Sequence, residues 1–144
     1  MSATLDANLL LFASDASSPF HDRARAFLEE LAEGPEIVYL FWPVVMAYIR
    51  IATHASIFQR PLSPEHAMAN VEALLALSHV QSPGEQDRLW TVFRAVAEPA
   101  VVRGNLVPGA LLVTLMRQND VATIYSRDRD FRRFDGIDVI DPLA

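Results

Sequence analysis

Acidic side chains follow two apolar segments that lie near opposite ends of this 144-residue sequence. Asp6 ends the apolar run that opens the chain, with Asn8 two residues later, and Asp128 and Asp130 follow the segment 121–125 (VATIY). Carboxylate oxygens are hard ligands of the kind that Mg²⁺ and Mn²⁺ prefer. Such ions polarise a phosphate ester, generate hydroxide and stabilise the leaving oxygen. These residue types therefore favour metal-assisted phosphodiester cleavage, with Asp6, Asp128 and Asp130 as catalytic metal ligands.

The elements that must position these acids alternate between short apolar strands and amphipathic helices. Residues 4–12 are expected to begin as a strand and to continue as a helix. We expect further strands at 36–40, 79–81, 121–125 and 137–140. We expect further helices at 21–33, 43–52, 64–78, 82–97 and from 107. The arginine-rich stretch 126–134 is expected to form a turn or a short helix. Such alternation predicts an α/β fold with a parallel sheet between helices. The carboxyl ends of parallel strands share one edge, where ligands bind, so Asp6 and the late pair should meet there. Taken singly, each Asp could instead be an ordinary turn or cap residue.

Two helix starts carry the same local signal, a serine followed by proline. Ser63-Pro64 and Ser82-Pro83 each place a good N-cap residue before a proline at the first helical position. Both are therefore predicted to open helices. Val107-Pro108 is expected to begin a further helix, GALLVTLMRQN, ahead of the strand at 121–125.

The charge composition limits how this chain could hold nucleic acid. The net charge is −6, from 12 basic and 18 acidic residues, and all twelve basic residues are arginines. An acidic protein cannot bind RNA through its overall charge, so binding must depend on a local cluster and on metal. Arg127, Arg129, Arg132 and Arg133 form such a cluster within seven residues beside the late acids. The absence of cysteine excludes disulfides, thiolate zinc sites and cysteine nucleophiles.

The length and hydropathy indicate a single domain, 1–144, without a membrane span. The longest apolar run, residues 37–49, is interrupted by Pro43 and is shorter than the ~20 residues that a spanning helix needs. The N-terminus lacks the basic region of a signal peptide. The absence of cysteine makes a cytoplasmic setting the expected one. The hydrophobic content of 51% is high for a free monomer of this size. It indicates either a surface covered by a partner or a well-filled core.

Four segments of the sequence resemble the VapC toxins, a family of PIN-domain ribonucleases. They are LDANLLL near the N-terminus, YIRIATHASIFQRPLSPEHA in the middle, RGNLVPGALL, and SRDRDFRRF near the C-terminus. The resemblance covers essentially the whole chain and implies a PIN-like three-layer α/β/α sandwich with a central parallel sheet. It also implies Mg²⁺- (or Mn²⁺-) dependent endoribonuclease activity on cellular RNA, a VapB-like antitoxin that blocks the site, and a homodimer.

The resemblance carries over unevenly to the individual residues. Asp6, Asp128 and Asp130 match family acids, and Asn8 matches the polar residue that commonly follows the first of them. Two further positions where the family usually has an acid hold Ala47 and Gly109. The missing acid at Gly109 leads to the hypothesis that this copy is attenuated. The alternative function is a catalytically silent PIN-domain module that titrates an antitoxin.

Other residues have weaker assignments. Arg50, Arg127 and Arg129, together with Asn8, are candidates for RNA contact, although each arginine could be an ordinary solvated side chain. Trp42 and Trp90 are expected in a core or an interface.

A phosphate-transfer fold of the haloacid-dehalogenase or receiver kind also has an acid after its first strand. That chemistry requires a later lysine, which this chain lacks.

Overall fold

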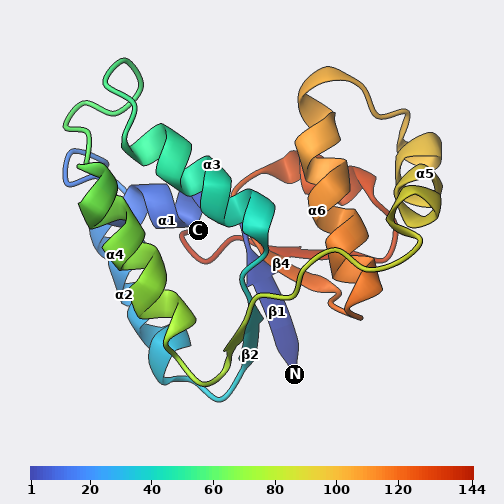
Figure 1. The fold of residues 1–144 in the computed structure, drawn as a ribbon, viewed down its shortest axis with the longest axis horizontal. Coiled ribbons are helices and arrows are strands. Elements are labelled where there is room, and N and C mark those ends of the chain that lie inside the picture. The colour runs from blue at the N-terminus through green and yellow to red at the C-terminus, as the bar shows by residue number, and fades with distance from the viewer.

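The computed structural model describes all 144 residues and contains one five-stranded parallel sheet. The strands are β1 (Ser2–Leu5), β2 (Ile37–Tyr39), β3 (Val80–Gln81), β4 (Thr123–Tyr125) and β5 (Asp138–Ile140). Their order in the sheet is β3-β2-β1-β4-β5, so β1 lies at the centre, between β2 and β4. The predicted parallel α/β arrangement is confirmed (Figure 1).

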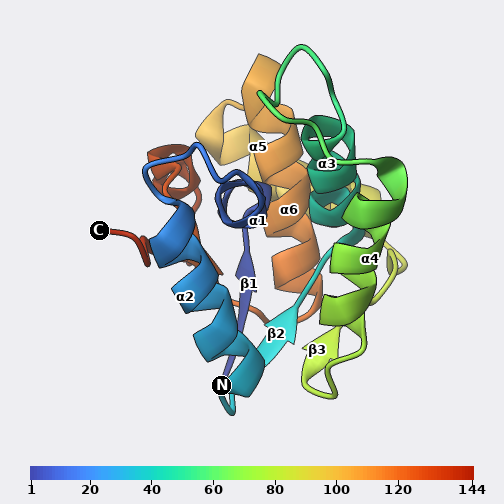
Figure 2. The ribbon, with the colours of Figure 1, turned by 90° about the vertical axis from the view of Figure 1, so that its left-hand side faces the viewer.

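Six helices and two short 3₁₀ helices surround the sheet. They are α1 (Ala7–Ser14), α2 (His21–Glu33), α3 (Trp42–Ala52), α4 (Pro64–Leu75), α5 (Leu89–Ala100) and α6 (Val107–Gln118), with η1 (Gly104–Leu106) and η2 (Arg129–Arg133). Helix α1 packs between α2 and α3, α4 packs on α3, and α5 packs on α6 (Figures 1 and 2). Helices α3 and α6, which are distant in sequence, also touch each other. Their contact builds one wall of the site described below.

The central strand is short because its apolar residues run directly into a helix. Ala3, Thr4 and Leu5 are buried, and the hydroxyl of Thr4 donates to the carbonyl of Tyr39 at 2.7 Å. That hydrogen bond satisfies the one polar side chain of β1 in the core. The backbone N–H of Asp6 donates to Tyr125 O at 3.0 Å and continues the β1–β4 pairing by one step. The ladder therefore fixes Asp6 at the carboxyl edge of the sheet, as predicted.

Of the two Ser-Pro signals, only Ser63-Pro64 opens a helix. The hydroxyl of Ser63 accepts the His66 backbone N–H at 3.1 Å, and Pro64 occupies the first position of α4. The helix ends at Leu75, three residues before the predicted end at Ser78.

The prediction that Ser82-Pro83 opens a helix is wrong, because α5 begins only at Leu89. The Ser82 hydroxyl is buried without a hydrogen-bond partner and caps nothing. The segment after it is tied instead to the end of α6, through Gln86–Asn119 and through Gln118 to the Asp87 carbonyl. Arg88 then adopts a left-handed conformation, with φ 68°, which interrupts any helix before Leu89.

Several large apolar side chains remain on the surface. Trp42, Met46, Met68 and Trp90 are among them, so neither tryptophan belongs to the core. None of the helices combines the length and the apolar character that crossing a membrane requires.

Candidate functional site

A pocket of about 190 Å³ opens at the carboxyl ends of β1 and β4, between α3 and α6. The polar side chains that line it come from three places in the chain. They are Asp6 and Asn8 after β1, Asn105 in η1, and Asp128 and Asp130 at η2. The apolar walls come mainly from α3 (Pro43, Val44, Ala47), α6 (Pro108, Gly109, Leu112) and the two phenylalanines Phe131 and Phe134. The fold thus brings both ends of the sequence to one cavity, as the strand pattern predicts.

Asp6 is held in this pocket by a serine that the sequence analysis did not single out. Asp6 occupies the N-cap position of α1, yet its carboxylate makes no capping hydrogen bond. Instead its Oδ2 accepts the hydroxyl of Ser126 at 2.9 Å. The same Ser126 oxygen accepts the backbone N–H of Asp128 at 2.9 Å, and Ser126 itself is 1% exposed. The available signal was a serine placed directly after a strand and two residues before an acid, a position where hydroxyls often bond a nearby N–H.

Partial burial of Asp6 disfavours the ionised form of its carboxyl group. Desolvation raises the pKa of the Asp6 carboxyl above its usual range, and the nearby charge of Asp128 raises it further. The hydrogen bond from Ser126 opposes this shift, as do the nearby backbone N–H groups of Ala7 and Asn8. Asp6 belongs to none of the structure's salt bridges, so no side-chain cation balances it. A bound cation would therefore stabilise the ionised form of the Asp6 carboxylate.

The late acids are less enclosed than Asp6. Asp128 is the N-cap of η2, and its Oδ1 accepts the backbone N–H of Asp130 at 2.9 Å. Asp130 lies on the outer side of the turn, where its Oδ1 is 3.9 Å from Nε of Arg133 and its side chain is 61% exposed. The three acids line one pocket, but no three acidic or histidine side chains converge closely enough to form a metal-binding group.

The two positions where acids are missing also line the pocket. Ala47 lies on the α3 wall, and Gly109 is the third residue of α6. A Cβ atom added at Gly109 would meet only the Phe131 ring, at 3.6 Å, which is an ordinary contact. The φ angle of Gly109 is not positive, so the backbone does not require glycine there. A Cβ atom at this position of the pocket lining is therefore accommodated without displacing a neighbour.

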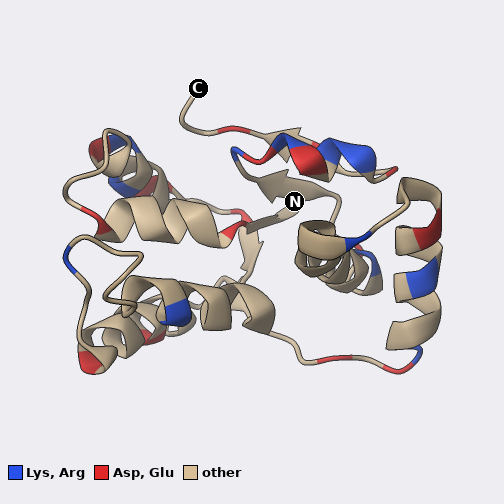
Figure 3. Ribbon diagram, turned by 90° about the horizontal axis from the view of Figure 1, so that it is seen from above, with Lys and Arg blue, Asp and Glu red and all other residues tan.

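The candidate arginines do not line the pocket. Arg50 is exposed on α3, and Arg129 is exposed at the start of η2. Seen from above, basic and acidic segments alternate along η2, whereas α3 carries a single basic segment (Figure 3). Arg127 points elsewhere: its guanidinium lies over the Phe20 ring, at 4.2 Å, and 3.5 Å from Asp141.

A second, larger cavity of about 530 Å³ lies between the first four helices. Its lining is mostly apolar and includes Leu10, Leu28, Leu62, Val71 and Leu74. At its base the Tyr48 hydroxyl contacts Ser14 Oγ at 2.7 Å and accepts from Asn70 at 3.0 Å. Arg25, Glu29 and His66 supply charged or ionisable groups along its rim. This cavity is a groove with an apolar floor and polar edges.

Comparison with known proteins identifies close relatives over the whole chain, although no protein-family model matches it. The chain is 47% identical over 144 residues to Ribonuclease VapC48 from Mycobacterium tuberculosis, covering 100% of this chain and 99% of that protein. The fold is similar to that of VapBC2 from Rickettsia felis, solved bound to a promoter DNA fragment, with a TM-score of 0.68 at 14% identity over 97% and 98% of the two chains.

A second solved structure is Mycobacterium tuberculosis VapC20, described as a toxin that cleaves the sarcin-ricin loop. The TM-score is 0.62 at 16% identity, over 90% of this chain and 92% of that one. These likenesses confirm the predicted PIN-like sandwich.

Proposed function

The chain belongs to the VapC ribonuclease family, and from that premise we propose that it is a toxin whose endonuclease activity cleaves cellular RNA with the help of a divalent cation. The observation that carries the proposal is the pocket between α3 and α6, where Ser126 links the carboxylate of Asp6 to the turn that bears Asp128. A phosphodiester bond placed there would face acids from both ends of the sequence. Asp6, Asp128 and Asp130 are the proposed catalytic residues.

Asp6 and Asp128 are the proposed holders of the cation, which we take to be Mg²⁺ or Mn²⁺. The donor set fits such an ion, because Mg²⁺ commonly binds one or two protein carboxylates and takes its other ligands from water and substrate phosphate. The partly buried carboxylate of Asp6, which has no cationic partner, supports the same assignment. When bound, the ion would polarise the phosphate and promote formation of hydroxide. Asp130, on the outer side of the turn, is proposed as a more peripheral acid.

The remaining residues of the site would position the RNA. Asn8 is exposed at the pocket and offers an amide that can both donate and accept hydrogen bonds. Arg129 is exposed beside the acids and is suited to a phosphate contact. Arg50 lies farther along the α3 wall and is proposed to contact RNA outside the pocket.

An RNA cleavage assay tests the proposed activity. We expect cleavage to require Mg²⁺ or Mn²⁺ and to fall by more than about a hundredfold in Asp6→Asn and in Asp128→Asn, since even partners of metal ligands are worth about 10–100-fold. Glu98→Gln, on the exposed face of α5, serves as the control and should cleave normally. Cleavage that survives Asp6→Asn or a chelator would contradict the proposal.

A second candidate function is favoured by Gly109 and Ala47. Both line the pocket, neither supplies a ligand, and no group of three acids forms. Under this hypothesis the copy is attenuated, or is a silent module that only titrates an antitoxin. A glycine in a helix costs roughly 1 kcal/mol relative to alanine, and no steric reason for it is present at this position.

The Gly109→Asp variant separates the two candidates when compared with Gly109→Ala and Gly109→Asn. Alanine restores helix propensity alone, asparagine adds a neutral side chain of the same shape, and aspartate adds a charged ligand. If the copy is attenuated, only Gly109→Asp gains Mn²⁺ affinity by calorimetry together with RNA cleavage. Equal Mn²⁺ affinity and cleavage in all four proteins would eliminate the attenuation hypothesis.

The groove between the first four helices is the proposed binding site for a VapB-like antitoxin. VapBC2, a fold relative, was solved as a toxin–antitoxin pair on DNA. The apolar floor suits the buried face of an amphipathic helix, and Arg25, Glu29 and His66 on the rim can pair with its polar face. Ala32→Arg, in the groove lining, should abolish binding of the cognate antitoxin. Ala26→Arg, on an exposed part of the same helix outside the groove, should not.

A homodimer is proposed through the outer face of α3. Trp42 and Met46 are exposed there, at 39% and 57%, on a helix that carries only one charged residue. Sedimentation of the wild type and of Met46→Glu tests this arrangement. A wild type that sediments as a monomer at high concentration would contradict it.

A further inference from the structure

Arg127 lies between two residues of the site but turns its side chain away from it. Ser126 faces Asp6, Asp128 lines the pocket, and the guanidinium of Arg127 packs over Phe20 at 4.2 Å and lies 3.5 Å from Asp141. Both partners in the ion pair are partly buried, with 34% and 26% of their side chains exposed. The pair is thus better shielded than the exposed pairs that contribute little to stability.

The partners of Arg127 are themselves anchored. Asp141 accepts the backbone N–H of Leu143 at 2.9 Å through its other oxygen, and Leu143 is 1% exposed in the core. The carbonyl of Leu143 accepts a hydrogen bond from Arg23 of α2. Phe20, in the turn before α2, packs on Phe12 with ring centroids 5.2 Å apart. The Arg127 side chain therefore joins the turn at 126–128 to the C-terminal segment and to the α1–α2 turn.

We infer that Arg127 is a positioning residue that, with Asp141, fixes the turn carrying Asp128, and that it does not contact the RNA. Ser126 restrains this turn from the pocket side, and Arg127 restrains it from the opposite side. Without Arg127, the Ser126–Asp128 hydrogen bond would open more often, and Asp128 would lose its fixed distance from Asp6. The last four residues of the chain thereby contribute to the geometry of the site.

This inference rests on the proposed nuclease function only for its cleavage measurement. Its other measurements need neither activity nor metal. Amide hydrogen exchange at Asp128 reports the Ser126–Asp128 hydrogen bond directly, and binding of single-stranded RNA without metal reports phosphate contacts. A protein that cleaves no RNA would contradict the proposed function but would leave the exchange measurement unaffected.

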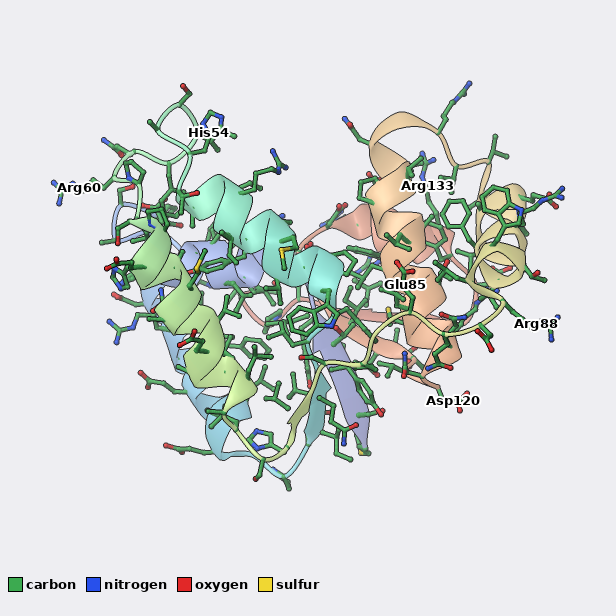
Figure 4. The ribbon with its side chains drawn as sticks, viewed as in Figure 1. His54, Arg60, Glu85, Arg88, Asp120 and Arg133 are labelled. Atoms are coloured by element: carbon green, nitrogen blue, oxygen red, sulfur yellow. The ribbon has the colours of Figure 1, made fainter.

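Two variants with opposite effects on charge test the inference. Arg127→Ala makes the protein more acidic, whereas Asp141→Asn makes it less acidic and keeps an oxygen for the Leu143 N–H. Arg129→Ala removes an exposed arginine from the same turn. Arg60→Ala removes an exposed arginine from the loop between α3 and α4, at the left edge of Figure 4, and serves as the control.

We expect Arg127→Ala and Asp141→Asn to behave alike despite their opposite charges. Exchange at Asp128 should rise about tenfold or more in both, with no change in the strand amides, because a local opening involves only the turn. Cleavage at saturating RNA should fall about tenfold or more, since small misplacements of catalytic groups reduce rates strongly. RNA affinity should stay within twofold of the wild type. Arg129→Ala should instead weaken RNA binding and leave exchange unchanged.

Opposite effects of the two variants on RNA affinity, weaker in Arg127→Ala and stronger in Asp141→Asn, would overturn the inference and identify Arg127 as an RNA contact. Unchanged exchange at Asp128 in Arg127→Ala would also overturn it. Faster exchange across the whole sheet would mean that the pair stabilises the fold generally, and this too would contradict a positioning role.

Discussion

Asp6 combines a partly buried position with a charge that no side chain neutralises. The backbone places it at the end of β1, and the single hydroxyl of Ser126 is its only side-chain donor. The pKa of its carboxyl is raised mainly by desolvation, so the folded protein disfavours the ionised form. Since the ionised form is the one that a cation binds, stability and metal binding oppose each other at this residue.

The Asp6→Asn variant should be more stable than the wild type at neutral pH. A carboxyl whose pKa is raised in the folded state stabilises the fold at low pH, and this contribution is lost as pH rises through the folded pKa. The melting temperature of the variant should therefore exceed that of the wild type at pH 7, and the gap should close toward acidic pH. Thermal unfolding followed by circular dichroism over a pH series measures this difference. A variant that is less stable at pH 7 would show that Asp6 is better solvated than its burial indicates.

Ser126→Ala should destabilise the protein and raise the pKa of Asp6 further. The substitution leaves an oxygen of Asp6 and the N–H of Asp128 without their partner, and each lost partner costs about 1–3 kcal/mol when buried. The hydrogen bond from Ser126 lowers the pKa of Asp6, so its removal shifts the pKa upward. Carboxyl titration by NMR and denaturant unfolding measure the two effects. Ser126→Thr keeps the hydroxyl and should preserve the pKa.

At the scale of elements, the same Ser-Pro signal has different outcomes at Ser63 and Ser82. Ser63 is exposed and free to bond the His66 N–H, so the cap forms. The segment after Ser82 packs against the end of α6 and is held there, outside a helix, by hydrogen bonds of Gln86 and Gln118. Local propensity is a weak preference that tertiary contacts can override.

Ser63→Ala tests the contribution of the cap that does form. Loss of an N-cap hydroxyl costs about 1 kcal/mol, so the free energy of unfolding should fall by that amount. Ser82→Ala is the matched control: its hydroxyl is buried without a partner, and removing it should leave stability unchanged or raise it. Urea denaturation of both variants measures the difference. Equal losses in the two variants would show that α4 does not depend on its cap.

At the scale of the whole molecule, a net charge of −6 must be reconciled with a polyanionic substrate. Acidic segments are spread over many elements, while η2 and its flanks, which carry Asp128 and Asp130, hold a dense run of basic segments (Figure 3). With Arg127 engaged by Asp141, the arginines left for RNA in this stretch are Arg129, Arg132 and Arg133. The electrostatic contribution to RNA binding should therefore be local and small.

The salt dependence of RNA affinity measures this contribution. Each contact to single-stranded phosphate adds about 0.7 to the slope of log affinity against log salt, so these three arginines and Arg50 predict a slope of about −3. Fluorescence anisotropy with a labelled RNA, in the absence of divalent metal, provides the measurement. A slope several times steeper would mean that further arginines on other elements also reach the substrate.

Much of the site could be predicted because its acids follow buried strands. Alternation of strands and helices predicted a parallel sheet, and a parallel sheet places Asp6 and Asp128 at one edge whatever the details of packing. The family could likewise be identified from LDANLLL and SRDRDFRRF, and the relatives confirm it. The assignments of individual site residues stay predictions until variants are measured.

The sequence by itself determined the family, the sheet and the edge at which the acids gather, because these depend on short-range pattern and chain order. Only the tertiary structure decided what surrounds each acid. It places Ser126 between Asp6 and Asp128, turns Arg127 toward Phe20 and Asp141, and leaves Gly109 beside Phe131 with space for a side chain. The contact between Ser126 and Asp6 joins residues 120 positions apart, and no local pattern encodes it. Asp6 thus depends for its chemistry on a neighbour that only folding brings close.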